Sequence, residues 1–229
     1  MKKKEVLQWM EENKDERGIR IMERTSNGVK SFGLGMTKLK ALAKKIGKNQ
    51  ALALELWDEA YYDTRILATL IADPAVITRN ELEKWIMNQD AWMISYSIGS
   101  NLLPHVPFLI ELSEDWAQSP NNHLRRCGYL GIVAICKANT VLPDEYFEPY
   151  LEIIEKNLQA EENFVKDAMN TALMAIGSHS KWLNSRALVI AEKIGKVEVD
   201  YGDNSCVVPD ALKHLTSEKV SEKFAEKMF

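Results

Sequence analysis

The sequence predicts an all-α fold of packed helical pairs, and three observations lead to this prediction. Apolar residues recur at helical spacing over most of the chain. Nothing alternates between apolar and polar residues for long enough to indicate a strand. Capping residues and glycines stand at the ends of the periodic segments. We therefore expect helix after helix joined by short loops, as in a degenerate α-solenoid.

The segment MTKLKALAKKIG, residues 36–47, shows the helical pattern clearly. At about 100° per residue, its apolar side chains fall within a stripe roughly 120° wide. The stripe consists of Met36, Leu39, Leu42, Ala43 and Ile46. The opposite side carries Lys38, Lys40, Lys44, Lys45 and Lys48. One side of this helix is expected to pack against the protein and the other to present positive charge.

Eight further segments show the same kind of amphipathic pattern. They are residues 50–60, 63–73, 81–89, 91–103, 123–138, 144–159, 163–177 and 181–195. The stretch VEVDYGDNSCVV, residues 197–208, lacks this pattern, and we expect it to form a loop with a turn at Gly202. Along the chain these segments predict antiparallel neighbours that bury their apolar faces against one another.

The ends of several helices are marked by residues suited to capping. Thr78 precedes Glu81 by three positions, which is the spacing of a capping box. Gly47, Gly177 and Gly195 stand just past periodic segments, where a left-handed cap favours glycine. No low-complexity segment or linker divides the chain. We therefore expect one helical domain over residues 1–229.

Composition narrows the range of functions. The chain has 229 residues and a net charge of −4, so it is not coated in basic surface, and any nucleic-acid contact must depend on where its positive charges lie. No apolar run approaches the roughly 18 residues needed to span a bilayer, and the start MKKKEVLQWM lacks the apolar core of a signal peptide. We therefore expect a cytoplasmic protein without a membrane partner.

Metal-binding and disulfide patterns are missing from the sequence. The three cysteines, Cys127, Cys136 and Cys206, include no CxxC pair and are expected to be small buried side chains. The four histidines make no HxxxH or HxxE spacing. Asp200, Asp203 and Cys206 are expected to belong to a turn. We therefore expect neither a metal nor a cofactor.

Five segments carry a resemblance to a known family. They are SFGLGMTKLKALAKKI (31–46), LWDEAYYDTRILATLIADP (56–74), ITRNELEKWIMNQDAWMISYSIGSNLL (77–103), HLRRCGYLGIVAICK (123–137) and NFVKDAMNTALMAIGSHS (163–180). Their order and spacing resemble the bacterial DNA alkylation repair family, the HEAT-like-repeat DNA glycosylases, over residues 17–216. The resemblance implies a right-handed superhelical α–α solenoid of degenerate HEAT-like repeats.

The resemblance also implies a chemistry. The family's substrates are N3- or N7-alkylated purines, and cleavage of their glycosidic bond leaves positive charge on the sugar. A carboxylate beside the sugar stabilises this charge and orients water. Aromatic faces hold the cationic nucleotide by cation–π attraction. The family is thought to use two tryptophans and one aspartate in a concave cleft, together with basic residues on the phosphates.

Carried over residue by residue, this catalytic set is incomplete. Trp92 matches the first tryptophan, but Tyr96 stands at the aspartate position, and a phenol with a pKa near 10 is neutral at pH 7. Thr171 stands at the position of the second tryptophan. The candidate catalytic residues are therefore Trp92 and Asp63, and Asp63 or Asp90 is the candidate substitute carboxylate. Trp92 and Tyr96 also fit a core pair, and Asp63 fits an ion pair with an arginine of another helix.

Basic residues form the candidate DNA-binding set. The resemblance assigns a phosphate contact to Arg126, with Arg125 beside it, and places the lysine side of 36–48 at the edge that faces DNA. The full set is Arg125, Arg126, Lys38, Lys44, Lys45 and Lys48. Helix capping, surface ion pairs and a solvated helix face are the alternatives for these residues.

Three functions remain open from the sequence. The first is a monomeric DNA-binding member of the family that holds duplex or distorted DNA, alkylated or not, in a basic concave groove. The second is an active glycosylase that uses a substitute carboxylate. The third is a solenoid scaffold for other proteins, and the net negative charge of the chain would favour basic partners. Excision and salt-dependent binding assays distinguish them.

Overall fold

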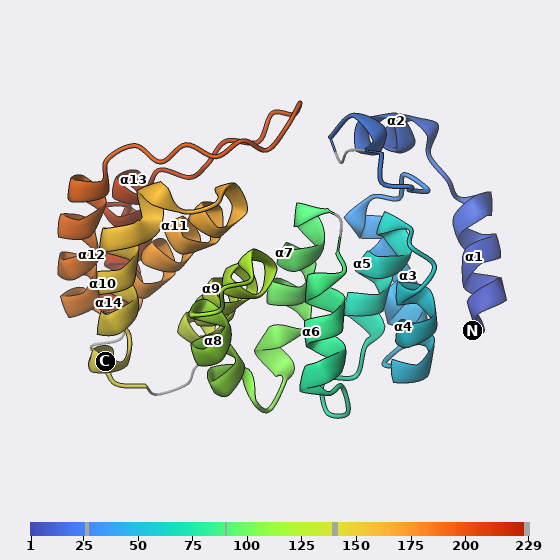
Figure 1. Ribbon diagram of the computed structural model, residues 1–229, viewed down its shortest axis with the longest axis horizontal. Coiled ribbons are helices and arrows are strands. Elements are labelled where there is room, and N and C mark those ends of the chain that lie inside the picture. Colours follow the sequence, from blue (N-terminus) through green and yellow to red (C-terminus); the bar gives the residue numbers. More distant parts are fainter. Residues whose placement is uncertain (26–27, 90, 139–141, 227–229) are drawn as a thin grey trace. The chain divides into compact units, whose positions relative to one another are not determined.

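The computed structural model describes residues 1–25, 28–89, 91–138 and 142–226, and within these ranges the chain is helical with no strand (Figure 1). The predicted all-α class is therefore confirmed. The chain divides into two compact units. Unit 1 comprises residues 1–109 and 201–205, and unit 2 comprises residues 110–200 and 206–229. The expectation of one domain over residues 1–229 stays a prediction.

Unit 1 contains the helices of the first half of the chain. Their bounds are α1 (Lys3–Glu12), α2 (Glu16–Thr25), α3 (Met36–Ile46), α4 (Gln50–Trp57), α5 (Tyr62–Ile71), α6 (Arg79–Met87), α7 (Trp92–Asn101) and η1 (Leu103–His105). Each predicted segment from 36 to 103 therefore forms a helix, and the predicted ends differ from the observed ones by at most three residues. Loops of a few residues separate these helices, as antiparallel packing requires.

Helix α5 is the centre of unit 1. It is buried along nearly its whole length and packs against α3, α4 and α7. The rings of Trp57 and Trp85 stack beside it, with centroids 4.4 Å apart and planes 3° apart. The guanidinium carbon of Arg65 lies 5.3 Å from the Trp57 ring centroid, so this buried cation is held by an aromatic face. This core fixes the positions of α3 and α7, which carry the candidate residues of unit 1.

Unit 2 contains the helices of the second half. Their bounds are α8 (Leu109–Ala117), α9 (Asn122–Lys137), η2 (Asp144–Tyr146), α10 (Glu148–Asn157), η3 (Leu158–Ala160), α11 (Asn163–Gly177), α12 (Lys181–Ile194), α13 (Ala211–Leu215) and α14 (Glu218–Glu226). Leu109, the first residue of α8, still belongs to unit 1. The predicted segment 144–159 forms α10 with a 3₁₀ turn at each end rather than one helix.

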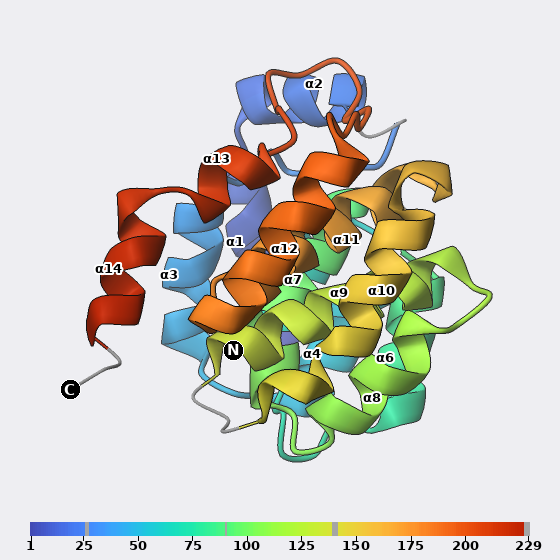
Figure 2. The ribbon, with the colours of Figure 1, turned by 90° about the vertical axis from the view of Figure 1, so that its left-hand side faces the viewer.

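Helix α11 is the centre of unit 2, where it packs against α9, α10, α12 and α13 (Figures 1 and 2). Glycines allow α8 to approach α9 closely. A Cβ atom at Gly128 would lie 2.2 Å from the backbone nitrogen of Ala117, and one at Gly131 would lie 2.2 Å from the Ser113 hydroxyl. Both positions in HLRRCGYLGIVAICK therefore require a residue without a side chain.

The structure confirms most of the predicted helix punctuation and corrects one part. Thr78 and Glu81 form the capping box. Gly47 and Gly195 have φ values of 75° and 71°, as left-handed residues after α3 and α12. Gly177 does not have this conformation, so the prediction of a left-handed cap there is wrong. It ends α11 inside the packed core, where a Cβ atom would lie 2.7 Å from that of Ala187.

The segment 197–208 is a loop, as predicted, and Gly202 in it has a φ of 81°. The three cysteines form no disulfide. Cys127 and Cys136 are buried as expected, but Cys206 is exposed because it lies in this loop rather than on a helix. Within the described ranges, no helix is both long and apolar enough to cross a bilayer.

Candidate functional site

Trp92 and Tyr96 lie one turn apart at the start of α7, and both are half-buried. Their rings meet edge to face, with centroids 5.8 Å apart and planes 78° apart. The intervening Ile94 and Ser95 point into the core and are fully buried. The pair therefore lies at the margin of the core of unit 1.

A third ring, from a distant part of the chain, completes this aromatic cluster. The ring centroid of Tyr201 lies 5.2 Å from that of Trp92, and Tyr201 is only 8% exposed. The loop around it is held in unit 1 by an ion pair between Arg24 and Asp203, at 3.0 Å. Asn204 also donates a hydrogen bond to the Tyr201 carbonyl, at 2.6 Å. Sequence patterns do not place Tyr201 beside Trp92, because 109 residues separate them.

Asp63 is fully buried at the start of α5 and binds the loop before α3. One carboxylate oxygen accepts from the Ser31 hydroxyl and the Phe32 backbone N–H, and the other accepts from the Leu34 N–H, each at 2.7 Å. Gly33, with a φ of 72°, lets the loop curve around the carboxylate. Asp63 therefore accepts three hydrogen bonds and, among the described residues, does not form the ion pair with an arginine that was expected. This geometry favours a structural role for Asp63.

The lysine side of α3 is open to solvent. Lys40, Lys44 and Lys45 are exposed and form no ion pair with any residue that the structure describes. Helix α3 also contains no acidic residue. Its positive charge is therefore not neutralised by its own side chains, and an anion can approach it.

Lys38 and Lys48, at the two ends of this side, are more constrained. The Lys38 amine donates to the Asn13 carbonyl at 3.1 Å, and the Lys48 amine donates to the Leu70 carbonyl at 3.2 Å. Burial lowers the pKa of Lys48 below its ordinary value, although Asp73 acts in the opposite direction. These two lysines are thus less available to a ligand than Lys44 and Lys45.

Helix α2 carries basic residues that the sequence analysis did not select. Arg17, Arg20 and Arg24 recur at a spacing of three and four residues, which places them on one side of the helix. All three are exposed, and Arg17 and Arg20 form no ion pair within the described part of the chain. The spacing of these arginines could have indicated a basic side of this helix in the sequence. The acidic residues among them made that pattern hard to recognise.

Arg125 and Arg126 in unit 2 are both engaged in packing. Arg125 makes two hydrogen bonds to Glu161, at 2.8 and 3.1 Å, and a third to the Ser119 carbonyl at 2.7 Å. Arg126 is 2% exposed, and its guanidinium carbon lies 5.0 Å from the Phe164 ring centroid. This placement favours structural roles for both, and a phosphate contact at either stays a prediction.

The remaining candidate positions fall outside unit 1 or outside the described residues. Thr171 is half-buried on α11 in unit 2, where its hydroxyl donates to the Asp167 carbonyl at 3.0 Å. Asp90 lies outside the described residues. Among the described residues, no group of three or more histidine, cysteine, aspartate or glutamate side chains is placed to hold a metal ion.

A family model matches most of the chain. The family model described as DNA alkylation repair enzyme matches residues 6–215. The uncharacterized proteins Lin0241 of Listeria innocua and Lmo0209 of Listeria monocytogenes are each 27% identical to the chain over 188 residues. Each match covers 80% of this chain and 81% of the relative.

A solved structure has the same fold. It has a TM-score of 0.87 and 24% sequence identity, and the match covers 98% of this chain and 96% of that one. It is described as a new family of proteins related to the HEAT-like repeat DNA glycosylases with affinity for branched DNA structures. This likeness confirms the HEAT-like-repeat fold class that the sequence predicts.

Proposed function

The chain belongs to the DNA alkylation repair enzyme family, and from this membership we propose that it is a DNA-binding protein that excises no base. The observation that supports the proposal is the phenol of Tyr96, whose ring meets that of Trp92 edge to face, at the position where the resemblance leads us to expect the family's carboxylate. A neutral ring in this position cannot stabilise positive charge on a sugar. The same fold can thus retain DNA affinity after losing the chemistry.

The uncompensated lysines of α3 support phosphate binding. Lys40, Lys44 and Lys45 project from one helix, and their ammonium groups are available to replace the counterions of a DNA backbone. Arg17 and Arg20 on α2 are further exposed cations in the same unit. The negative net charge of the whole chain does not oppose this proposal, because binding depends on local charge.

Branched or otherwise distorted DNA is the substrate class that we favour. A protein of the same fold is described as having affinity for branched DNA structures. Lysine and arginine contacts to the backbone carry no base sequence information, which suits the recognition of DNA by its shape. We also propose that Trp92, which is half-buried, contacts an unstacked base, since aromatic side chains stack on any base.

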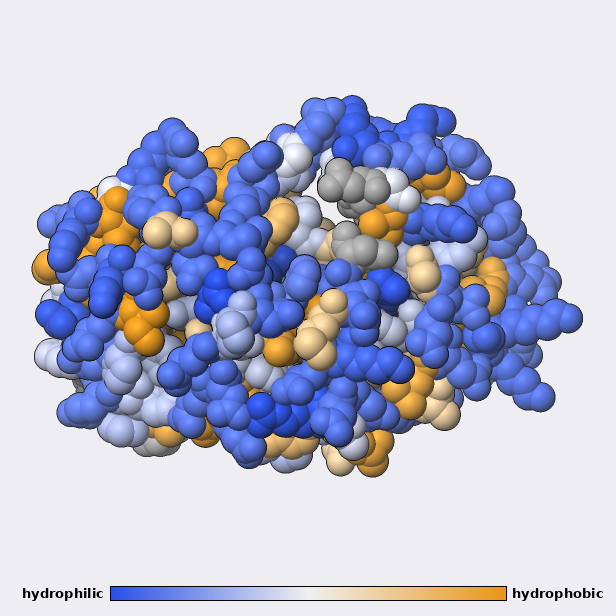
Figure 3. All heavy atoms as spheres, in the orientation of Figure 1, coloured by the Kyte–Doolittle hydropathy of each residue, from blue (hydrophilic) through white to orange (hydrophobic). Residues whose placement is uncertain are grey.

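Membership of the family bears on where in the cell the protein acts. We propose a bacterial, cytoplasmic protein, since the DNA of bacteria lies in the cytoplasm, and we propose that it acts as a monomer. The face in Figure 3 is consistent with a monomer, because hydrophilic residues dominate it and apolar residues form separated patches rather than one continuous area.

Two measurements on the unmodified protein test the proposal. In the first, binding to a duplex, a three-way and a four-way junction is titrated against salt, and we expect affinity to fall steeply as salt rises. In the second, duplex DNA carrying N7-methylguanine or N3-methyladenine is incubated with the protein, and we expect no released base. Absence of binding at low salt would favour the protein scaffold, and clear turnover would favour an active glycosylase with a substitute carboxylate.

A further inference from the structure

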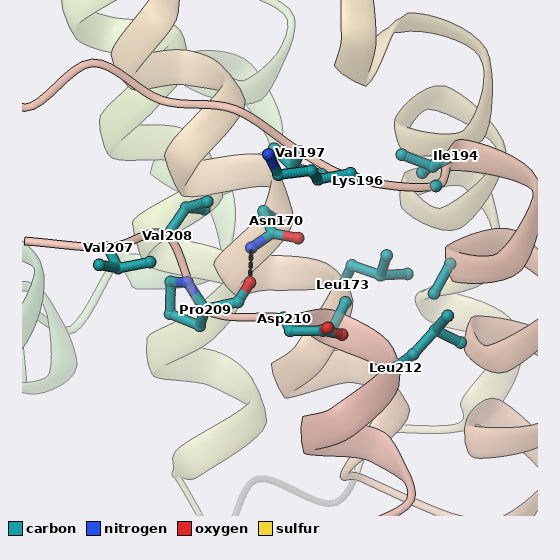
Figure 4. Close-up of a pocket in the computed structure, with 13 residues that line it drawn as sticks. Asn170, Leu173, Ile194, Lys196, Val197, Val207, Val208, Pro209, Asp210 and Leu212 are labelled. Atoms are coloured by element: carbon teal, nitrogen blue, oxygen red, sulfur yellow. Dashed lines mark hydrogen bonds between the residues drawn. The ribbon is translucent and has the colours of Figure 1, made fainter.

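Unit 2 contains a cavity of about 370 Å³ between α11 and the segments that follow α12 and precede α13 (Figure 4). Its walls are mostly apolar and include Leu173, Ile194, Val197, Val208 and Leu212. Small-molecule sites in proteins have a similar size and character, with a few polar groups that orient the ligand. The cavity is remote in sequence from Trp92 and from the lysines of α3.

Among the polar residues that line this cavity, Asn170 of α11 is fully buried. Its amide nitrogen donates to the Pro209 carbonyl at 2.9 Å, which fixes the orientation of the amide. The amide oxygen is turned away from Pro209, toward the side of Leu173 (Figure 4). Within the described residues, no donor reaches this oxygen. A buried acceptor without a donor is costly, so the cavity favours a guest that supplies one.

The charged residues at the rim of the cavity are already engaged. The Lys196 amine pairs with Glu198 at 2.8 Å. The Asp210 carboxylate caps α13 by accepting from the Lys213 N–H at 3.0 Å. Both charged groups thus already have partners, and the burial of a charged guest among the aliphatic walls would be unfavourable. This argument selects an uncharged guest.

We propose that this cavity binds a small, uncharged, largely apolar molecule that carries one N–H or O–H donor, and that the donor bonds to the Asn170 amide oxygen. The aliphatic walls contribute affinity by burying the apolar part of the guest. The buried amide oxygen contributes selectivity, because a guest without a donor leaves Asn170 unsatisfied. Residues at both ends of the loop 196–210 line this cavity, and Tyr201 lies in the middle of the same loop.

The test compares two bicyclic probes of nearly the same size and shape. Indole has one N–H donor, whereas benzofuran has a ring oxygen and no donor. Each is titrated into the full-length protein, and binding is followed by calorimetry and by amide chemical shifts around Asn170. We expect indole to bind and benzofuran to bind at least about tenfold more weakly, as the loss of a hydrogen bond to a buried acceptor predicts. Equal affinities, or no binding of indole at millimolar concentration, would overturn the proposal.

Two variants locate the binding event without changing Asn170. Leu212→Trp places a larger ring at a half-buried position in the cavity wall, and we expect it to abolish indole binding. Val189→Trp introduces the same ring at a 61% exposed position of α12, and indole should still bind. Circular dichroism establishes that both variants fold. If Leu212→Trp is folded and binds indole normally, the guest lies elsewhere. No DNA is used, so the outcome is independent of the proposed DNA binding.

Discussion

The ring of Tyr201 lies against the ring of Trp92, with centroids 5.2 Å and planes 46° apart. Trp92 therefore has aromatic neighbours on two sides, Tyr201 from a loop and Tyr96 from its own helix. Two phenol side chains therefore contact this tryptophan, and Tyr96 is the one that we predict to stand at the family's carboxylate position. The arrangement explains why DNA binding without excision is the function we favour.

Restoring the family's residues tests whether Tyr96 silences the site. We expect the double variant Tyr96→Asp/Thr171→Trp to release a small amount of N7-methylguanine from duplex DNA, because the carboxylate supplies the missing negative charge. Activity should stay weak, since a catalytic group must lie within about 0.5 Å of its productive position. The matched control is Tyr96→Asn/Thr171→Trp, which lacks the charge and should release none. Equal release by the two variants would remove the carboxylate from the explanation.

Charge reversal on α3 tests the proposed phosphate contacts. Lys44→Glu/Lys45→Glu should weaken DNA binding severalfold or more at low salt and lower the slope of affinity against salt by up to about two. The control Lys4→Glu/Lys84→Glu makes the same change in net charge at exposed positions on α1 and α6. Binding is measured by fluorescence anisotropy. If both variants weaken binding equally, overall charge rather than the lysine side of α3 is responsible.

Removing the charge of Asp63 tests its structural role. Asp63→Asn should lower the free energy of unfolding by about 2–4 kcal/mol, because the new amide group faces donors where the carboxylate accepted three hydrogen bonds. Asp58→Asn at the exposed end of α4 should change it by less than about 0.5 kcal/mol. Urea denaturation measures both. A stable Asp63→Asn protein would show that the loop 31–34 does not depend on the carboxylate.

The two hydrogen bonds between Arg125 and Glu161 lead to a prediction about stability rather than DNA binding. Arg125→Ala should cost about 1–3 kcal/mol, because it leaves a partly buried carboxylate without its partner. Arg186→Ala breaks a more exposed pair with Glu148 and should cost less than about 1 kcal/mol. The slope of DNA affinity against salt should be the same for Arg125→Ala and for the unmodified protein. A lower slope would instead support the phosphate contact that the family resemblance suggests.

The cysteines should differ in reactivity. Burial raises the pKa of Cys136 to about 12, and because the thiolate is the reactive form, this thiol should stay unlabelled at pH 8. Cys206 is exposed and should react with an aromatic disulfide reagent within the native protein. Raising the pH toward 12 should increase the labelling of Cys136. Cys206→Ser should abolish the fast reaction, and a fast reaction that persists in this variant would contradict the buried placement of Cys127 and Cys136.

The sequence by itself determined the local structure of the chain. Helical periodicity marked the segments that became α3–α7 and α9–α12, because the face that a helix buries must repeat every three to four residues. The Thr78–Glu81 capping box was equally predictable, since all its hydrogen bonds join residues three apart. The ordered resemblance of five segments also identified the family, whereas the replacement of the family's aspartate by Tyr96 stays a prediction.

Only the tertiary structure decided what each candidate side chain contacts. Lys44 and Arg126 looked alike as basic residues on amphipathic helices, yet one is exposed and the other lies buried against Phe164. Tyr201 meets Trp92 and Asp63 meets Leu34 across 109 and 29 residues of sequence. Contacts of this kind depend on how helices and loops pack, and no periodicity within one segment encodes them. For the same physical reason, the unsatisfied oxygen of Asn170 and the cavity beside it could be found only in the folded chain.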